Sequence, residues 1–223
     1  MKVTKEFLRD KHACATGYKW FCENCLELVD FEDQIKHLSK HRFDWTNWLL
    51  VRLMSLEQKR KYAIFAAEKV LDIFEAKYPT DKRPRKAIEA AEAVLKNNTK
   101  ENRAKADAAA DDAYTAYDDA YDDADDATYT VVADAASSAA AASAVASSAT
   151  SAAAYAYADA AAVSAASAAA SAADTSAYAY AYADDAAAAA DAAGAADSTI
   201  KETIINYGLE LIIKELKDES NRI

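Results

Sequence analysis

The chain has 223 residues, a formal net charge of −11 and a 52% share of hydrophobic residues, much of it alanine. This length allows one domain with a good core, or a domain with an extension. Three cysteines crowded near the N-terminus do not form a secreted disulfide framework, and the charged first ten residues contain no apolar run typical of a signal peptide. We therefore expect a cytoplasmic protein.

Charge is distributed unevenly along the chain. Residues 1–103 carry a net charge of +5, residues 104–199 of −15 and residues 200–223 of −1. Such a molecule either offers an acidic surface to a basic partner or carries a solvated face that keeps an alanine-rich bundle soluble. We expect a single integrated helical domain over residues 1–223. It comprises a mixed-composition N-terminal part, a part rich in Ala, Asp, Tyr and Ser, and a C-terminal closing helix.

Short helices are expected first, over residues 5–9, 17–29 and 33–40. Asp44 is then a typical N-cap residue for a helix that contains Trp45 and Trp48. The apolar residues of this helix recur at helical spacing, which predicts that one side faces a core.

The next helix has clear boundary signals. Ser55 and Gln58 form a capping-box pattern, which opens a long helix that should end before Pro79. Asp81 can cap the following helix, over residues 85–95. Pro84 lies near the start of that helix, where a missing N–H has no cost.

Residues 104–199 are dominated by alanine, with 48 Ala and 16 Asp among 96 positions and no proline. Alanine has the best helix propensity, so the tract is expected to be helical. Groups of Ser, Thr and Asp recur every 22 to 24 residues, at 128–130, 150–151, 174–176 and 197–199. Because these residues favour caps, we expect four helices of about 20 residues and a fifth over residues 200–217. The fold class is all-α, a compact multi-helix bundle or stack of antiparallel helices with a tightly packed, alanine-rich C-terminal half.

Tyrosine supplies the bulk that alanine lacks. Tyr114, Tyr117 and Tyr121 fall on one helical face, and aspartates fill most of the remainder. One interpretation packs this tyrosine stripe inward and leaves the carboxylates in water, and the other makes it a tyrosine-lined ligand groove. The apolar residues 204–216 predict a closing segment that packs back on the N-terminal half.

The nearest approach to a metal motif is Cys22-x2-Cys25-x11-His37-x3-His41, one residue short of a two-cysteine, two-histidine zinc spacing. Both cysteines lie in a segment predicted to be helical, and small buried cysteines at helical spacing are the simpler interpretation. We therefore predict no structural zinc and no cofactor. No Ser/His/Asp or Cys/His arrangement and no Gly-rich phosphate loop stand out, so we expect a protein that is not an enzyme.

Two arginines flank a proline at the start of a predicted helix. Arg83 and Arg85 place guanidinium groups beside free backbone N–H groups, an arrangement that favours anion binding. Alternatively, either arginine pairs with Asp81, Glu75 or Asp44 and locks the corner between two helices. The sequence leaves both interpretations open.

Three motifs carry a resemblance to a known family. They are Asp44-Trp45-x2-Trp48-Leu49-Leu50, Tyr62-Ala63-Ile64-x2-Ala67-Glu68-x2-Leu71-x2-Phe74-Glu75 and Tyr78-Pro79-x-Asp81-x-Arg83-Pro84-Arg85-x-Ala87-Ile88-Glu89-Ala90. On these motifs, residues 8–210 resemble the immunity-protein-like family of bacterial toxin loci and bacteriophage genomes. The resemblance implies an all-α, non-enzymatic binding protein.

Three functions fit these observations. The first is an immunity-like or phage counter-defence inhibitor that neutralises a protein effector through an acidic helical face. The second is a sponge for a small anionic ligand, such as a signalling nucleotide, held between Arg83, Arg85 and aromatic side chains. The third is nucleic-acid mimicry by rows of aspartates.

The candidate binding residues combine the arginine element, three aromatic positions and one acidic cluster: Arg83, Arg85, Trp45, Trp48, Tyr78, Asp118, Asp119, Asp122 and Asp123. The expected partner is a protein effector or a small anionic ligand. We expect no membrane and no direct nucleic-acid binding, and leave a homo-oligomer open. A phage-encoded chain would act in the host cytoplasm.

Overall fold

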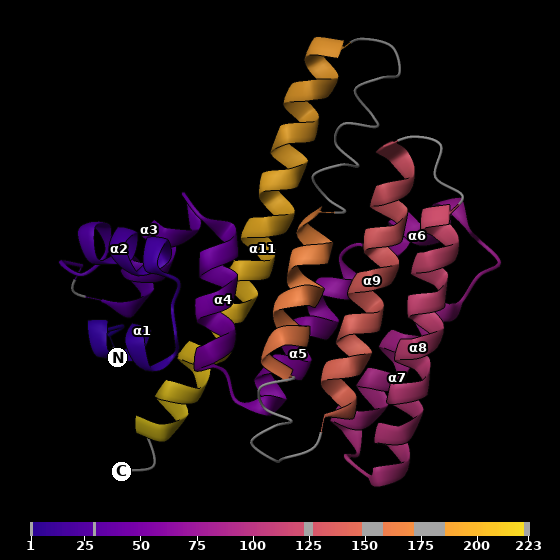
Figure 1. Ribbon diagram of the computed structural model, residues 1–223, viewed down its shortest axis with the longest axis horizontal. Helices are drawn as coiled ribbons and strands as arrows, with labels where there is room; N and C mark the ends of the chain where they lie inside the picture. The colour runs from indigo at the N-terminus through magenta and orange to yellow at the C-terminus, as the bar shows by residue number, and fades with distance from the viewer. Residues whose placement is uncertain (1, 29, 123–126, 149–157, 172–185, 221–223) are drawn as a thin grey trace. The chain divides into compact units, whose positions relative to one another are not determined.

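A computed structural model of the chain describes residues 2–28, 30–122, 127–148, 158–171 and 186–220, and every regular element in these ranges is a helix (Figure 1). The all-α fold class is therefore confirmed. The chain forms two compact units, one of residues 1–53 and 205–223 and the other of residues 54–204. Within the described ranges, no helix has both the length and the apolar character needed to cross a membrane.

The first unit contains four short helices and the end of a long one. They are α1 (Lys5–Asp10), α2 (Ala15–Asn24), α3 (Phe31–Ser39), α4 (Phe43–Leu53) and the C-terminal residues of α11 (Ala186–Ser220). Each contributes buried apolar side chains to this unit: Leu8, Phe21, Ile35, Leu38, Leu49, Leu50, Ile205, Leu209 and Ile212. The apolar C-terminal segment thus packs with the N-terminal helices.

Polar contacts stabilise the turns of the first unit. The Sγ atom of Cys14 accepts a hydrogen bond from the N–H of Gly17 at 3.3 Å and so caps α2. The fully buried amide of Gln34 joins two distant backbone segments. Its Oε1 accepts from the N–H of Val3 at 2.9 Å, and its Nε2 donates to the C=O of Cys25 at 3.1 Å.

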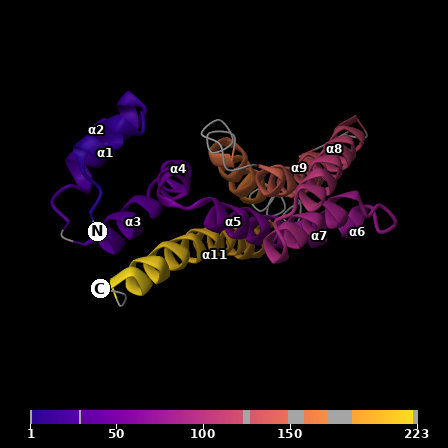
Figure 2. The same cartoon turned by 90° about the horizontal axis from the view of Figure 1, so that it is seen from below.

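The second unit contains α5 (Leu56–Glu68), α6 (Leu71–Lys77), α7 (Arg83–Lys96), α8 (Lys100–Asp122), α9 (Ala127–Ser147), helical residues 158–171 and the beginning of α11. The helices α7, α8 and α9 pack against one another, and α8 and α9 run in opposite directions (Figure 1). Figure 2 shows the same three helices side by side from below. Larger buried side chains, such as Tyr62 and Phe74, come from α5 and α6, whereas α8 and α9 bury mainly alanine.

Serine hydroxyls connect the alanine-rich helices. Ser143 Oγ of α9 donates to the C=O of Ala106 of α8 at 2.7 Å, and Ser138 Oγ donates to the C=O of Ala165 at 2.8 Å. Both serines are fully buried. Small residues let helix axes approach closely but give little shape to fix their register. We infer that these hydrogen bonds help to set that register.

Helix boundaries in the N-terminal half follow the sequence in part. The capping box of α5 is confirmed, because Ser55 and Gln58 each accept the other's backbone N–H. The N-cap expected at Asp44 is wrong, since Asp44 lies in the first turn of α4. The long helix expected up to Pro79 is two helices. The N–H of Val70 bonds three residues back to the C=O of Ala67, in the turn that separates α5 from α6, which begins at Leu71.

Two of the predicted breaks in the alanine tract are wrong. Residues 128–130 lie in the first turn of α9, and residues 197–199 lie inside α11, so residues 200–217 are not a separate helix. In α11 the hydroxyl of Thr203 donates to the C=O of Thr199 at 2.6 Å. This bond within the helix satisfies the hydroxyl without ending the helix. The breaks expected at 150–151 and 174–176 lie outside the described residues.

Candidate functional site

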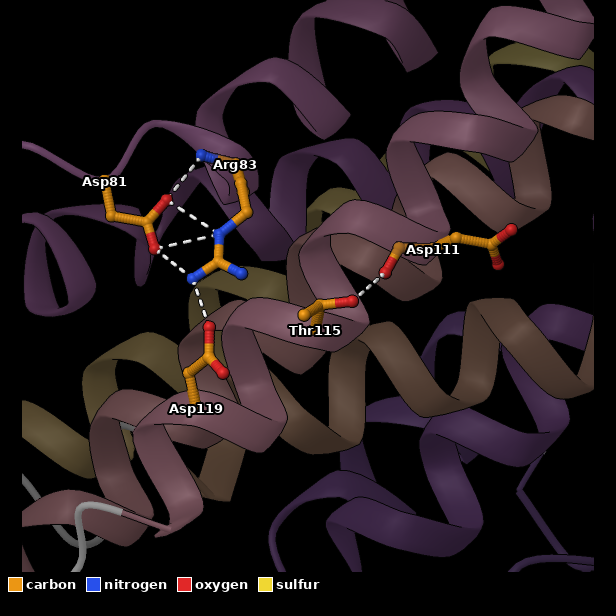
Figure 3. A network of polar contacts seen from close by, with 5 residues as sticks. All are labelled: Asp81, Arg83, Asp111, Thr115 and Asp119. Atoms are coloured by element: carbon orange, nitrogen blue, oxygen red, sulfur yellow. Dashed lines mark hydrogen bonds and ion pairs between the residues drawn. The ribbon is translucent and has the colours of Figure 1, made fainter.

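Arg83 is the centre of a network of polar contacts where α7 begins (Figure 3). The carboxylate of Asp81 accepts a hydrogen bond from the backbone N–H of Arg83 at 2.9 Å. It also accepts hydrogen bonds from Nε and Nη2 of the Arg83 guanidinium. The same Nη2 donates to Asp119 of α8 at 2.7 Å. Burial alone would raise the pKa of Asp81, but the hydrogen bonds from Arg83 outweigh it and lower this pKa. Arg83 therefore joins the start of α7 to the last turns of α8.

Arg85 belongs to a second network at the corner between α6 and α7. Its guanidinium makes two hydrogen bonds to the carboxylate of Glu75, the first from Nε to Oε1 at 2.7 Å and the second from Nη2 to Oε2. Lys82 Nζ lies 3.1 Å from Glu75 Oε1. The hydrogen bond from Arg85 is the main reason why the pKa of Glu75 falls from 4.5 to about 2.

Both arginines make contacts that the structural-lock interpretation predicts. Asp81 and Glu75 are two of the three carboxylates that it names, whereas Asp44 forms no ion pair with any described residue. Asp119 is a further partner that the sequence did not indicate, because it lies 36 positions after Arg83, with α7 and most of α8 between them. Whether a partner also contacts these arginines stays a prediction.

The helix α8 has an alanine side and an acidic side. Its buried stripe consists of Ala106, Ala110, Ala113, Ala116 and Ala120. We call the opposite, exposed side the acidic face of α8, formed by Asp107, Asp111, Asp112, Asp118 and Asp119 together with Tyr114 and Thr115. Thr115 Oγ1 donates to the C=O of Asp111 at 3.1 Å, so its hydroxyl is directed along the helix (Figure 3).

The inward tyrosine stripe is wrong at its first position. Tyr114 is 43% exposed, and Tyr117 is half-buried. Alanine occupies the side of α8 that packs against α7 and α9, and small side chains let helix axes approach closely. Of the predicted acidic cluster, Asp118 and Asp119 lie on the acidic face. Asp123 and the side chains of Tyr121 and Asp122 lie outside the described part.

The three aromatic candidates occupy different surroundings. Trp45 and Trp48 belong to α4 of the first unit, and each carries a stacked guanidinium: Arg42 lies 3.9 Å from the Trp45 ring centroid and Arg52 lies 4.0 Å from that of Trp48. Tyr78 follows α6 in the second unit, and its ring packs on Phe74 with a centroid separation of 5.3 Å. These residues are therefore divided between the two units.

The Cys and His residues of the approximate zinc motif differ in their burial, from buried Cys25 to exposed His41. Cys25 is fully buried, and burial raises the pKa of its thiol to about 11, which disfavours the thiolate that binds metals. The rings of His37 and His41 lie 5.1 Å apart. Within the described ranges, no group of three or more His, Cys, Asp or Glu residues is arranged to hold a metal ion.

Two buried cations in α5 were missed by sequence reasoning. Lys59 and Arg60 are each only 4% exposed. Arg60 Nη2 donates to the C=O of Ser148 at the end of α9, at 2.6 Å, and Lys59 Nζ lies 2.6 Å from Asp159 Oδ1. The sequence did carry a signal for the burial of Arg60. This residue lies four positions after Leu56, and so on the same face of the helix as that buried side chain.

A family comparison connects these features to a class of protein. Residues 50–157 match the family described as "Imm-5 like putative immunity protein". The match confirms the family resemblance over this segment, which includes α5 to α9 and the end of α4, and it supports an immunity-type protein in general. No curated protein and no solved structure matches the chain.

Proposed function

We propose that this chain is a non-enzymatic inhibitor of the immunity or phage counter-defence type, which neutralises a protein effector through the acidic face of α8. The observation that carries the proposal is the division of α8 into a buried alanine stripe and an exposed row of aspartates around Tyr114. The alanine side packs within the fold, and Asp119 of the acidic side binds Arg83 of α7. The rest of the acidic side is therefore available to a partner.

The charges on this face are mostly uncompensated. Asp119 is bound to Arg83, whereas Asp107, Asp111, Asp112 and Asp118 form no ion pair with any described residue. Aspartates that the fold does not need are expected either to serve solubility or to meet a basic partner. The resemblance to immunity proteins, which implies a protein target, supports the second role.

The face combines charge with one large aromatic side chain. Carboxylates in a row speed the encounter with a basic surface and exclude acidic competitors. Tyrosine is among the residue types that dominate binding energy at interfaces, because its ring buries a large area at low entropic cost. Tyr114 is therefore the proposed anchor of the contact, and the flanking aspartates orient the partner.

The experiment is affinity capture from host cells with the purified chain, followed by reconstitution with the captured protein in pure form. One variant carries Asp111→Lys, Asp112→Lys and Asp118→Lys. A matched control carries Glu210→Lys, Glu215→Lys and Asp218→Lys, which reverses three exposed carboxylates of α11 and changes net charge equally. We expect the first variant to lose the partner and the control to keep it.

Salt provides an independent measurement on the reconstituted pair. Exposed charges are screened beyond about 10 Å at 0.1 M ionic strength, so affinity should fall as salt rises. Affinity that is insensitive to salt and survives the three Asp→Lys changes would overturn the proposal.

A further inference from the structure

The junction between α3 and α4 is the most basic segment of the first unit. Five of the seven residues from 36 to 42 are Lys, His or Arg. Lys36 is bound to Glu32 at 2.6 Å. Lys40, His41 and Arg42 are exposed and form no ion pair with any described residue. This junction therefore presents positive groups that the fold does not neutralise.

Aromatic rings gather at the same junction. The ring of Trp20, from α2, has centroid separations of 6.0 Å from His37, 5.7 Å from His41 and 6.0 Å from Trp45. Trp20, His37 and Trp45 are half-buried, and His41 is exposed. Helices α2, α3 and α4 thus bring indole and imidazole rings together with part of their surface accessible.

Arg42 connects the charges to the rings. Its guanidinium lies 3.9 Å from the centroid of Trp45, a stacked arrangement that orients the group while leaving its N–H donors at the rim. The carboxylates nearest in sequence, Asp33 and Asp44, are exposed and form no ion pair with it. Arg83 and Arg85 of the second unit differ, because their guanidinium groups are bound to carboxylates.

We propose that Arg42, His41, Trp20 and Trp45 form a binding site for a nucleotide. Arg42 and His41 supply the charge-assisted and imidazole hydrogen bonds that a phosphate group accepts. The accessible parts of Trp20 and His41 supply a π-rich surface for the base, beside the Trp45 ring that carries Arg42. The site is in the first unit and does not depend on the acidic face of α8.

The test measures binding to the full-length chain by isothermal titration calorimetry, with tryptophan fluorescence as a second readout. The probes are inorganic phosphate, adenosine, adenosine and guanosine monophosphates, and a single-stranded oligothymidylate. We expect saturable binding of a mononucleotide, tighter than that of phosphate or adenosine. Mononucleotide dissociation constants weaker than about 1 mM would overturn the proposal. So would an affinity confined to the oligonucleotide, because the ligand would then be a nucleic-acid strand.

Substitutions separate this site from general electrostatic attraction. Arg42→Ala should weaken mononucleotide binding about tenfold or more. Arg52→Ala is the matched control. Arg52 stacks on Trp48 in the same way at 4.0 Å, but it donates a hydrogen bond to the C=O of Trp48. An equal loss in both variants would overturn the proposal.

Two further variants separate the phosphate from the base and guard against misfolding. Trp20→Leu should weaken mononucleotide binding more than phosphate binding, because Trp45 still stacks on Arg42. An unchanged mononucleotide affinity would contradict the role of the rings. Melting temperatures show whether each variant is folded. If Arg42→Ala does not fold, His41→Ala replaces it, because the exposed imidazole can be removed at little structural cost. Full mononucleotide affinity in a folded His41→Ala variant would then overturn the proposal.

Discussion

Lys59 Nζ of α5 lies 2.6 Å from Asp159 Oδ1, and the two side chains are 5% and 27% exposed. Next to this pair in sequence, Arg60 donates to the C=O of Ser148. Most of the buried neighbours that α9 and residues 158–171 contribute are alanines. Charged contacts of α5 therefore reach both alanine-rich helices and supply directional contacts that methyl groups cannot.

The first prediction concerns this buried ion pair. Asp159→Ala removes the carboxylate next to a buried ammonium group, and we expect a loss of about 2–3 kcal/mol in the free energy of unfolding. Urea denaturation followed by circular dichroism measures it. Asp107→Ala, at an exposed aspartate that forms no ion pair with a described residue, is the control and should change stability by less than about 0.5 kcal/mol. Equal effects of the two substitutions would contradict the prediction.

The second prediction concerns pH. The pKa of Glu75 is lowered from 4.5 to about 2 by its hydrogen bonds with Arg85 and Lys82. Its folded form therefore resists protonation, so its contribution to stability is complete above pH 4.5 and is lost as the pH falls toward 2. Glu75→Gln should lower stability at neutral pH and reduce the further loss of stability below pH 4.5. Melting temperatures measured from pH 7 into the acid range test this prediction. A fall in melting temperature with acid that is equal in the variant and the unchanged chain would count against it.

The third prediction concerns Arg83. Arg83→Ala removes the fork that binds Asp81 and the contact with Asp119, and we expect a loss of about 1–2 kcal/mol with helicity unchanged. Arg83→Lys should recover little of it, since an ammonium group cannot reproduce the planar fork. Lys86→Ala is the control on the same helix, because Lys86 is exposed and forms no ion pair with a described residue. An equal loss of stability in Lys86→Ala and Arg83→Ala, measured by chemical denaturation, would refute the structural role of Arg83.

The fourth prediction concerns the alanine stripe of α8. Ala113 is fully buried, so Ala113→Leu forces apart closely packed helices and should cost about 1–3 kcal/mol. Ala108 lies on an exposed position of the same helix, and Ala108→Leu should change stability by less than about 0.5 kcal/mol. Thermal unfolding of the two variants compares the same chemical change on opposite sides of α8. Similar melting temperatures for both would show that the stripe is not tightly packed.

Much of the secondary structure was determined by the sequence itself. Alanine content, helical periodicity and the capping box at Ser55 depend on local backbone energetics, which act within a few residues. The helices α7 and α8 followed from such signals. The breaks placed at residues 128–130 and 197–199 were wrong, because Ser, Thr and Asp favour caps but can also lie within a helix.

Only the tertiary structure decided which side of α8 is buried and what the charged residues contact. Helical spacing places Tyr114 and Ala113 on different sides, but it does not say which side meets α7 and α9. The pair Arg83 and Asp119 and the pair Lys59 and Asp159 join residues 36 and 100 positions apart. Such contacts depend on how whole helices pack, and local sequence patterns carry no information about distances between elements.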